Sequence, residues 1–132
     1  MPLDIRDLTP LLQVFDMPTS VRFYRDLLGF DLVNTSGPGE DFGWGLLRRN
    51  GAEVMLNTAY DVGERPPAPD PARQAAHADT TLYLGCPDVD AAYRFLREKG
   101  LAVKPPVIQR YGMKQLYVVD PDGYHVCFQW PA

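Results

Sequence analysis

The sequence has little cysteine and no long apolar run, and each absence excludes a class of protein. Its two cysteines, Cys86 and Cys127, do not form a Cys-x-x-Cys pair, so neither a zinc ribbon nor a disulfide framework is indicated, and a reducing, cytoplasmic setting is expected. No stretch approaches the roughly 18 consecutive apolar residues of a membrane-spanning helix. Residues 1–7 are charged where a secretory signal has an apolar core, so membrane insertion and secretion are both disfavoured.

Positive charge is also scarce. The chain has 13 Lys and Arg residues against 17 Asp and Glu residues, and the basic ones are scattered along it. Nucleic acid is therefore not an expected partner, because neutralising phosphates requires a positive face. At 132 residues the chain corresponds to a single domain, which is long enough to bury a core without disulfides or a structural metal.

The first half of the chain predicts one strand followed by one helix. Residues 8–15 form a short apolar run that favours a strand. Thr19 or Ser20 can cap the helix that follows, and Gly29 is placed to end it. Four apolar side chains fall on one face of this helix: Val21, Tyr24, Leu27 and Leu28.

Three further strands are predicted after that helix. The first covers residues 30–33, and the other two, 44–49 and 52–58, flank the dipeptide Asn50-Gly51. This dipeptide between two apolar runs predicts a two-residue hairpin, because both residues tolerate a positive φ.

A proline-rich linker over residues 60–77 is predicted next, with one helical turn at 72–76. Its prolines cannot donate hydrogen bonds to a sheet and favour an extended connection. His77, at the end of the linker, is expected to be a solvated surface histidine.

The same order of elements then returns. A strand over residues 80–84 precedes a helix over 88–99, and two strands flank the turn at 120–123. The side chains expected on the inward face of this helix are Tyr93, Phe95 and Leu96. Gly29 and Gly100 lie 71 residues apart, and the turn glycines Gly51 and Gly123 lie 72 apart, which indicates an internal duplication.

The predicted fold is α+β, with two tandem βαβββ modules. They cover residues 5–59 and 78–132 and are joined by the linker 60–77. Neither module can bury both faces of its sheet alone, so we expect the two to form a curved mixed sheet around a cleft, with the helices outside. Edge strands of such sheets need covering, which favours a homodimer.

The opening run LLQVFDMPTSVRFYRDLLGFDLV and the closing run YVVDPDGYHVCFQ resemble the vicinal oxygen chelate superfamily. This superfamily includes glyoxalase I, extradiol dioxygenases, fosfomycin resistance enzymes and bleomycin-binding resistance proteins. The resemblance extends from Leu8 to Trp130, so residues 1–132 are expected to form one domain of this fold. It leaves the activity open, because these motifs are structural parts shared by many chemistries.

The resemblance also implies four positions at which metal-using members carry His, Gln or Glu. Here they are assigned to Thr9, Met55, Asp79 and Cys127, none of which is the usual ligand. No metal or other cofactor is therefore expected. The alternative is an unusual three-ligand metal site formed by Asp79, His125 and Cys127.

Alternation along the strands assigns side chains to the cleft. The hairpin register places Trp44 opposite Asn57, Leu46 opposite Met55 and Arg48 opposite Glu53. The loop 111–114 is a candidate lid. The predicted ligand-binding residues are Phe15, Trp44, Met55, Asp79, Tyr83, Tyr111, Met113, His125 and Cys127.

The favoured function is metal-independent binding or sequestration of an aromatic or amphipathic small molecule, as in bleomycin-resistance-type proteins. One alternative is an enzyme, either a lyase, isomerase or dioxygenase with an atypical metal site, or an acid–base catalyst. For the acid–base catalyst, burial in the cleft would raise the pKa of Asp79 or Glu53. Another alternative is a regulatory dimer whose cleft is filled by Phe15 and Met55.

Overall fold

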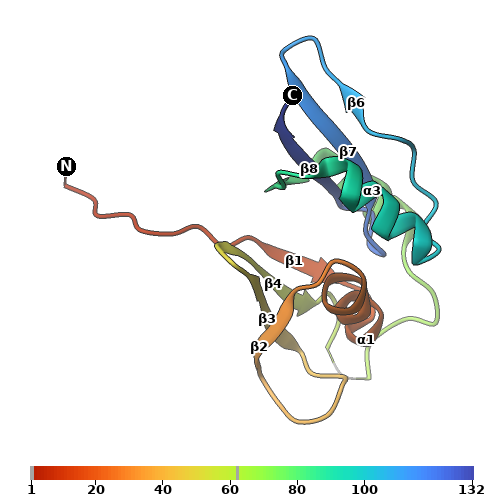
Figure 1. Ribbon diagram of the computed structural model, residues 1–132. Coiled ribbons are helices and arrows are strands. Elements are labelled where there is room, and N and C mark those ends of the chain that lie inside the picture. Colours follow the sequence, from red (N-terminus) through yellow and green to blue (C-terminus); the bar gives the residue numbers. More distant parts are fainter. Residues whose placement is uncertain (1, 62) are drawn as a thin grey trace. The chain divides into compact units, whose positions relative to one another are not determined.

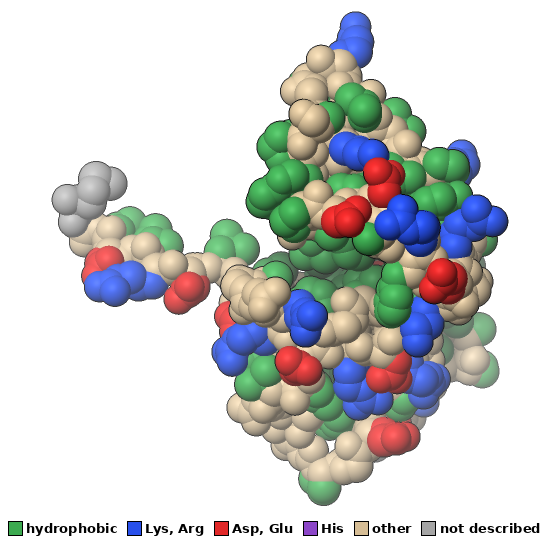
Figure 2. All heavy atoms as spheres, in the orientation of Figure 1, with side chains coloured by type: hydrophobic (Ala, Val, Ile, Leu, Met, Phe, Trp, Pro, Cys, Tyr) green, Lys and Arg blue, Asp and Glu red, His purple; other side chains and the backbone are tan. Residues whose placement is uncertain are grey.

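The computed structural model describes residues 2–61 and 63–132, and the chain divides into two compact units, Met1–Arg65 and Pro66–Ala132. Each unit contains one four-stranded mixed sheet with a helix packed on one face, which confirms the α+β class (Figure 1). No helix among the described residues is long and apolar enough to cross a membrane. Basic and acidic side chains are interspersed on the face seen in Figure 2.

Unit 1 has the predicted order of elements. In its sheet β1 runs parallel to β4, the other neighbours are antiparallel, and the order is β1-β4-β3-β2. Its elements are β1 (Leu11–Val14), α1 (Met17–Val21), the π-helical η1 (Arg22–Leu27), β2 (Asp31–Thr35), β3 (Trp44–Arg49) and β4 (Ala52–Thr58).

The helix of unit 1 begins earlier than predicted and changes its winding. Asp16 is its cap, in place of Thr19 or Ser20, because the Asp16 carboxylate accepts a hydrogen bond from the Thr19 backbone N–H at 3.0 Å. In η1 the hydrogen bonds span five residues, as from Leu28 N–H to Phe23 C=O at 3.0 Å. Phe23 of this segment is buried, although the 3.6-residue period did not select it.

The hairpin of unit 1 has the predicted register. The pairs Trp44 with Asn57, Leu46 with Met55, and Arg48 with Glu53 are all observed. Only the turn differs from expectation: Asn50 has a φ of 52°, whereas Gly51 does not adopt the left-handed region.

Unit 2 repeats this order of elements, and two short helical segments precede its first strand in the chain. The sheet order is β5-β8-β7-β6, with β5 parallel to β8. Its elements are α2 (Pro71–Ala76), the 3₁₀ turn η2 (His77–Asp79), β5 (Thr81–Gly85), α3 (Val89–Glu98), β6 (Val107–Ile108), β7 (Met113–Val119) and β8 (His125–Pro131).

The end of the predicted linker is docked on unit 2. The His77 ring stacks on Tyr124 with centroids 4.0 Å apart, and its Nδ1 lies 2.7 Å from the Asp122 carbonyl oxygen. His77 is therefore half-buried, and the expectation of a solvated histidine is wrong. Gly123 has a φ of 90°, and a Cβ there would lie 2.3 Å from the Gln74 carbonyl oxygen, so this contact requires glycine.

Helix α3 is amphipathic, but one of its predicted core residues is not buried. Asp88 caps the helix by accepting from the Ala91 backbone N–H at 2.9 Å, and Val89 and Leu96 are buried. Phe95 is 47% exposed, contrary to the prediction, and the Lys99 ammonium lies 5.4 Å from its ring centroid.

The core of each unit lies between its sheet and its helix. In β4, Val54 and Leu56 are buried on the helix side, while Met55 is half-buried on the other face. In β8, Val126 and Cys127 are both fully buried although they point to opposite faces. Cys127 is therefore covered on the helix-free face of the sheet as well.

Candidate functional site

The helix-free face of each sheet carries the polar and aromatic groups that the sequence assigns to binding. In unit 1, Trp44 and Met55 lie on this face, Met55 between its cross-strand partners Leu11 and Leu46. Asn57 Nδ2 donates to Gln13 Oε1 at 3.3 Å beside them. The structure thus brings Trp44 and Met55 onto one largely apolar surface.

The Glu53 carboxylate lies at the edge of this apolar surface. Glu53 accepts hydrogen bonds from Arg48 Nε at 2.7 Å and from Thr9 Oγ1 at 3.0 Å. The Arg48 hydrogen bond above all, and that of Thr9, hold the pKa of the Glu53 carboxyl below its ordinary value. This is opposite to the raised pKa expected of a general base, so Glu53 is held as a paired carboxylate.

Phe15 lies in a different hollow of unit 1. It follows the end of β1 and packs edge-on against Tyr60, with ring centroids 6.2 Å apart, and the Arg65 guanidinium lies 5.6 Å from its ring centroid. These residues line a hollow of about 240 Å³ together with Asp41, Phe42, Gly43, Thr58, Asp61 and Gly63.

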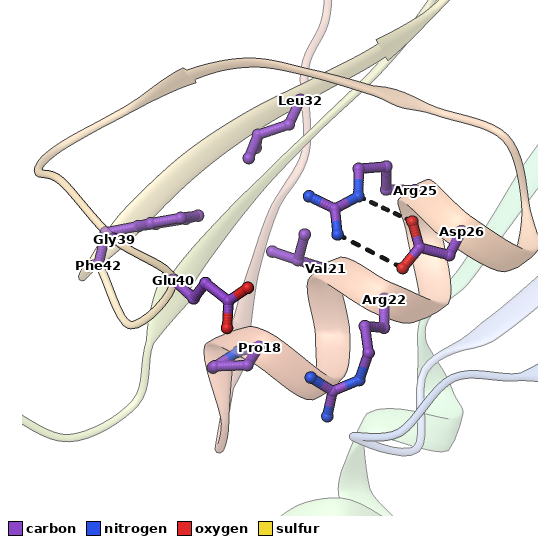
Figure 3. A pocket seen from close by; sticks show the side chains of 9 residues that line it. All are labelled: Pro18, Val21, Arg22, Arg25, Asp26, Leu32, Gly39, Glu40 and Phe42. Atoms are coloured by element: carbon purple, nitrogen blue, oxygen red, sulfur yellow. Dashed lines mark hydrogen bonds and ion pairs between the residues drawn. The ribbon is translucent and has the colours of Figure 1, made fainter.

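A smaller hollow of about 110 Å³ lies beside the π-helical segment (Figure 3). Its charged side chains are exposed, and Arg25 donates to Asp26 from two nitrogens at 2.8 and 3.4 Å. Because such pairs are screened by water, this hollow is a weaker candidate for a ligand site.

In unit 2 the helix-free face is built from tyrosines over a cysteine. Register places Cys127 between Tyr83 and Tyr117, whose hydroxyl oxygens lie 3.3 Å apart. The hydrogen bond with Tyr83 and burial raise the pKa of Tyr117, and burial raises the pKa of the Cys127 thiol. Cys127 is therefore a covered, protonated thiol beneath the two tyrosines.

A glutamine ties this face together. Gln115 is 4% exposed, and its Oε1 accepts from Tyr111 Oη at 2.9 Å and from Tyr117 Oη at 3.4 Å. Its Nε2 donates to Gln129 Oε1 at 2.9 Å. The predicted lid residue Tyr111 is thereby linked to the sheet face.

A hollow of unit 2 lies against this network. It measures about 380 Å³ between β7 and the segment that leads into β6. Gln115 and Tyr117 supply polar groups, and Lys104 lies at its lining. The apolar lining comes from Leu101, Ala102, Val103, Pro105, Val107, Val118 and Val119.

The remaining predicted residues of unit 2 are spread along the sheet. His125 pairs with Thr81 on the same face as Cys127, and Met113 starts β7 opposite Pro131. Asp79 is exposed at the end of η2, two residues before β5 begins at Thr81.

The duplication reassigns one family position. Leu11 pairs with Met55 as Tyr83 pairs with Cys127, a shift of 72 residues in both strands. The counterpart of Thr9 is therefore Thr81, so the assignment of Asp79 was two residues early.

The residues present do not fit a divalent metal. Thr9 donates its hydroxyl to Glu53, Met55 offers only a thioether, and the Cys127 thiol is kept protonated by burial. Within residues 2–61 and 63–132, no three His, Cys, Asp or Glu side chains are grouped to hold an ion. The alternative cluster of Asp79, His125 and Cys127 is thus not formed.

Two residues of the network escaped the sequence analysis. Tyr117 and Gln115 lie on β7, which the sequence placed only coarsely as a strand before the turn at 120–123. Alternation from Met113 onward selects both, since residues 113, 115 and 117 share one face. The period-2 signal was therefore available in this strand.

Comparison with known proteins defines the class. Residues 8–128 match the Glyoxalase/Bleomycin resistance protein/Dioxygenase superfamily, and the chain belongs to this superfamily. No curated protein matches the chain.

Solved structures are similar over nearly the whole chain. TnmS3, an antibiotic binding protein from Streptomyces sp. CB03234, is 26% identical, with a TM-score of 0.70 over 100% of this chain and 99% of that one. A bleomycin-binding protein complexed with bleomycin is 20% identical, with a TM-score of 0.72 over 97% and 100% of the chains. TioX from Micromonospora sp. ML1 is 17% identical, with a TM-score of 0.75 over 96% and 99%.

Proposed function

We propose that this protein binds and sequesters an aromatic or amphipathic small molecule without a metal. The carrying observation is the 380 Å³ hollow of unit 2, with its apolar lining and few polar groups, beside three exposed tyrosines. Ligand sites of roughly 300–1,000 Å³ typically have this composition. Tyrosine rings add about 0.5–1.5 kcal/mol per aromatic contact beyond the area that they bury.

The similarity to antibiotic-binding structures supports this proposal. TnmS3 is described as an antibiotic binding protein, and a second similar structure contains bleomycin. Catalysis by acid–base chemistry has less support here, because the pKa of Glu53 is lowered and Asp79 is exposed. We therefore place the predicted site residues of unit 2 in ligand contact, as a wall for stacking and hydrogen bonding.

A homodimer in a reducing compartment completes the proposal. Both cysteines are free thiols, and β1, β2, β5 and β6 are edge strands within their own sheets. Unpaired edges favour association. Light scattering should give about twice the 14.8 kDa chain mass, and a monomer at micromolar concentration would contradict the dimer.

The binding proposal is tested with bleomycin and a panel of planar aromatic antibiotics, by calorimetric titration. Tyr117→Ala should weaken a bound compound by roughly five- to tenfold, because it removes a stacking ring worth about 1 kcal/mol or more. Phe95→Ala is the matched control, since Phe95 is 47% and Tyr117 42% exposed. Equal losses in both variants, or no saturable binding by any compound, would contradict the assignment.

A further inference from the structure

The carboxyl end of the sheet in unit 1 forms a hollow that the proposed function does not use. β1 runs parallel to β4 with Val14 opposite Thr58, so Phe15 and Tyr60, which follow these positions, leave the sheet at the same end. The Ala59 backbone N–H donates to the Val14 carbonyl oxygen at 2.8 Å and joins the two chain segments. The backbone therefore holds together the two aromatic walls of this 240 Å³ hollow.

One of these walls carries a cation of the chain itself. The Arg65 guanidinium lies 5.6 Å from the Phe15 ring centroid. This is within the roughly 6 Å over which the negative face of an aromatic ring attracts a positive charge. The ion pair that holds Arg65, from Nη1 to Asp16 Oδ1 at 3.0 Å, is open to water, with side chains 38% and 32% exposed. Because exposed pairs are screened, a ligand can displace this guanidinium from the ring.

The hollow has more carboxylates than cations. Asp41 and Asp61 line it and are exposed, and neither joins an ion pair within the described part of the chain. Arg65 is the one cation among the described residues that line the hollow. The excess of negative charge raises the local concentration of cations, which favours a positively charged ligand.

We propose that this hollow is a second binding site, which takes a quaternary ammonium group in place of the Arg65 guanidinium on the Phe15 ring. Aromatic walls recognise such groups through the attraction between the cation and the ring face. Sites for whole drug-sized ligands measure roughly 300–1,000 Å³, so a hollow of about 240 Å³ suits a headgroup. The site lies within unit 1 and goes beyond the function proposed for unit 2.

Choline and 3,3-dimethylbutan-1-ol separate charge from shape, because the second compound has carbon where choline has its charged nitrogen. In an NMR titration of the full-length protein, choline should bind about tenfold more tightly than the neutral compound. Phe15→Leu keeps an apolar side chain but removes the ring, and should weaken choline about fivefold without changing the neutral compound. Phe95→Leu is the matched control, since Lys99 lies 5.4 Å from that ring but Phe95 is on α3 and does not line the hollow.

Arg65→Gln gives a change of the opposite sign. It removes the cation that occupies the Phe15 ring and should tighten choline binding by about threefold or more. Damage to the fold would weaken binding instead, and thermal melting confirms that each variant is folded. Arg25→Gln is the control, because Arg25 is in an ion pair of similar exposure with Asp26 and does not line this hollow.

The outcomes distinguish the two proposals. Equal affinity for choline and the neutral compound would overturn the ammonium site, as would equal losses in Phe15→Leu and Phe95→Leu. It would also be overturned if Arg65→Gln bound choline no more tightly than the wild type. No saturable binding of choline would overturn the site in unit 1 and leave the function of unit 2 in place, since that function is measured with aromatic compounds and Tyr117→Ala.

Discussion

At the scale of single residues, the helix-free faces of the two sheets differ in the three side chains that lie next to one another across their central strands. In unit 1 the positions are filled by Leu11, Met55 and Leu46, and in unit 2 the two flanking positions are tyrosines. Tyrosines bring hydroxyls that need partners, and Gln115 supplies one. One buried amide thus accepts from two hydroxyls of the face in unit 2.

Burial of Cys127 makes a prediction about thiol chemistry. A disulfide-exchange reagent should titrate about one thiol in the native protein, Cys86, and two in denaturant, because Cys127 is 0% exposed whereas Cys86 is half-buried. Cys86→Ser is the control and should react negligibly until it unfolds. Rapid native reaction of this variant would contradict the covered position of Cys127.

The pairing of Glu53 predicts how stability depends on pH. Its folded-state pKa is lowered, so its contribution is complete above the ordinary value of 4.5 and is lost as pH falls through the lowered pKa. The stability difference between wild type and Glu53→Gln should therefore shrink from about pH 6 to about pH 3 in urea unfolding. A difference that grows with acidity would show that Glu53 is not stabilised as a carboxylate.

At the scale of elements, the duplication preserves the strands and varies the connections. Both parallel pairs have the same register, shifted by 72 residues. The turns after β3 and β7 differ, because helix α2 packs only against the second turn, where Gln74 lies next to Gly123. Asp120 Oδ1 fixes this second turn by accepting from the backbone N–H groups of Asp122 and Tyr124, each at 2.9 Å.

The equivalent turn glycines give a matched pair of variants. Gly123→Ala should destabilise the protein by more than about 2 kcal/mol, because φ is 90° and the new Cβ would lie 2.3 Å from the Gln74 carbonyl oxygen. Gly51→Ala should change stability by less than about 1 kcal/mol, since nothing lies within 4 Å of its Cβ. Chemical unfolding of both variants measures this, and equal effects would contradict the docking of α2.

At the scale of the whole molecule, the chain has two units, and the boundary between them in the sequence falls within the proline-rich segment. The boundary follows Arg65, and residues 71–79 belong to unit 2 through the stack of His77 on Tyr124. Part of the segment read from sequence as a linker is therefore structure.

Limited proteolysis tests this organisation. A protease specific for glutamate should cut native protein first at Glu64, which is exposed and next to the boundary, to give fragments of residues 1–64 and 65–132. Glu98, exposed at the end of α3, is an internal comparison and should be cut much later. Mass spectrometry of the fragments over time identifies the order of cleavage. Cleavage at Glu98 before Glu64 would contradict the two-unit organisation.

The sequence predicted the bounds of some elements accurately, but for others it predicted the position without the exact start or winding. The strands 44–49 and 52–58 and their register are confirmed, because an Asn-Gly turn between apolar runs leaves little choice of pairing. The cap at Asp16 and the burial of Phe23 were missed. A π-helical turn depends on packing against the sheet and has no signal in a 3.6-residue period.

By itself, the sequence determined the duplication, the order of elements, the resemblance to the superfamily and the register of the first hairpin. These properties depend on local periodicity and on turn residues that lie close together in the chain. Only the tertiary structure decided that Gln115 accepts hydrogen bonds from Tyr111 and Tyr117, that Cys127 is covered and that His77 is docked. Each of these depends on partners that strand pairing or helix docking brings together, up to 47 residues apart in the chain, as for His77 and Tyr124.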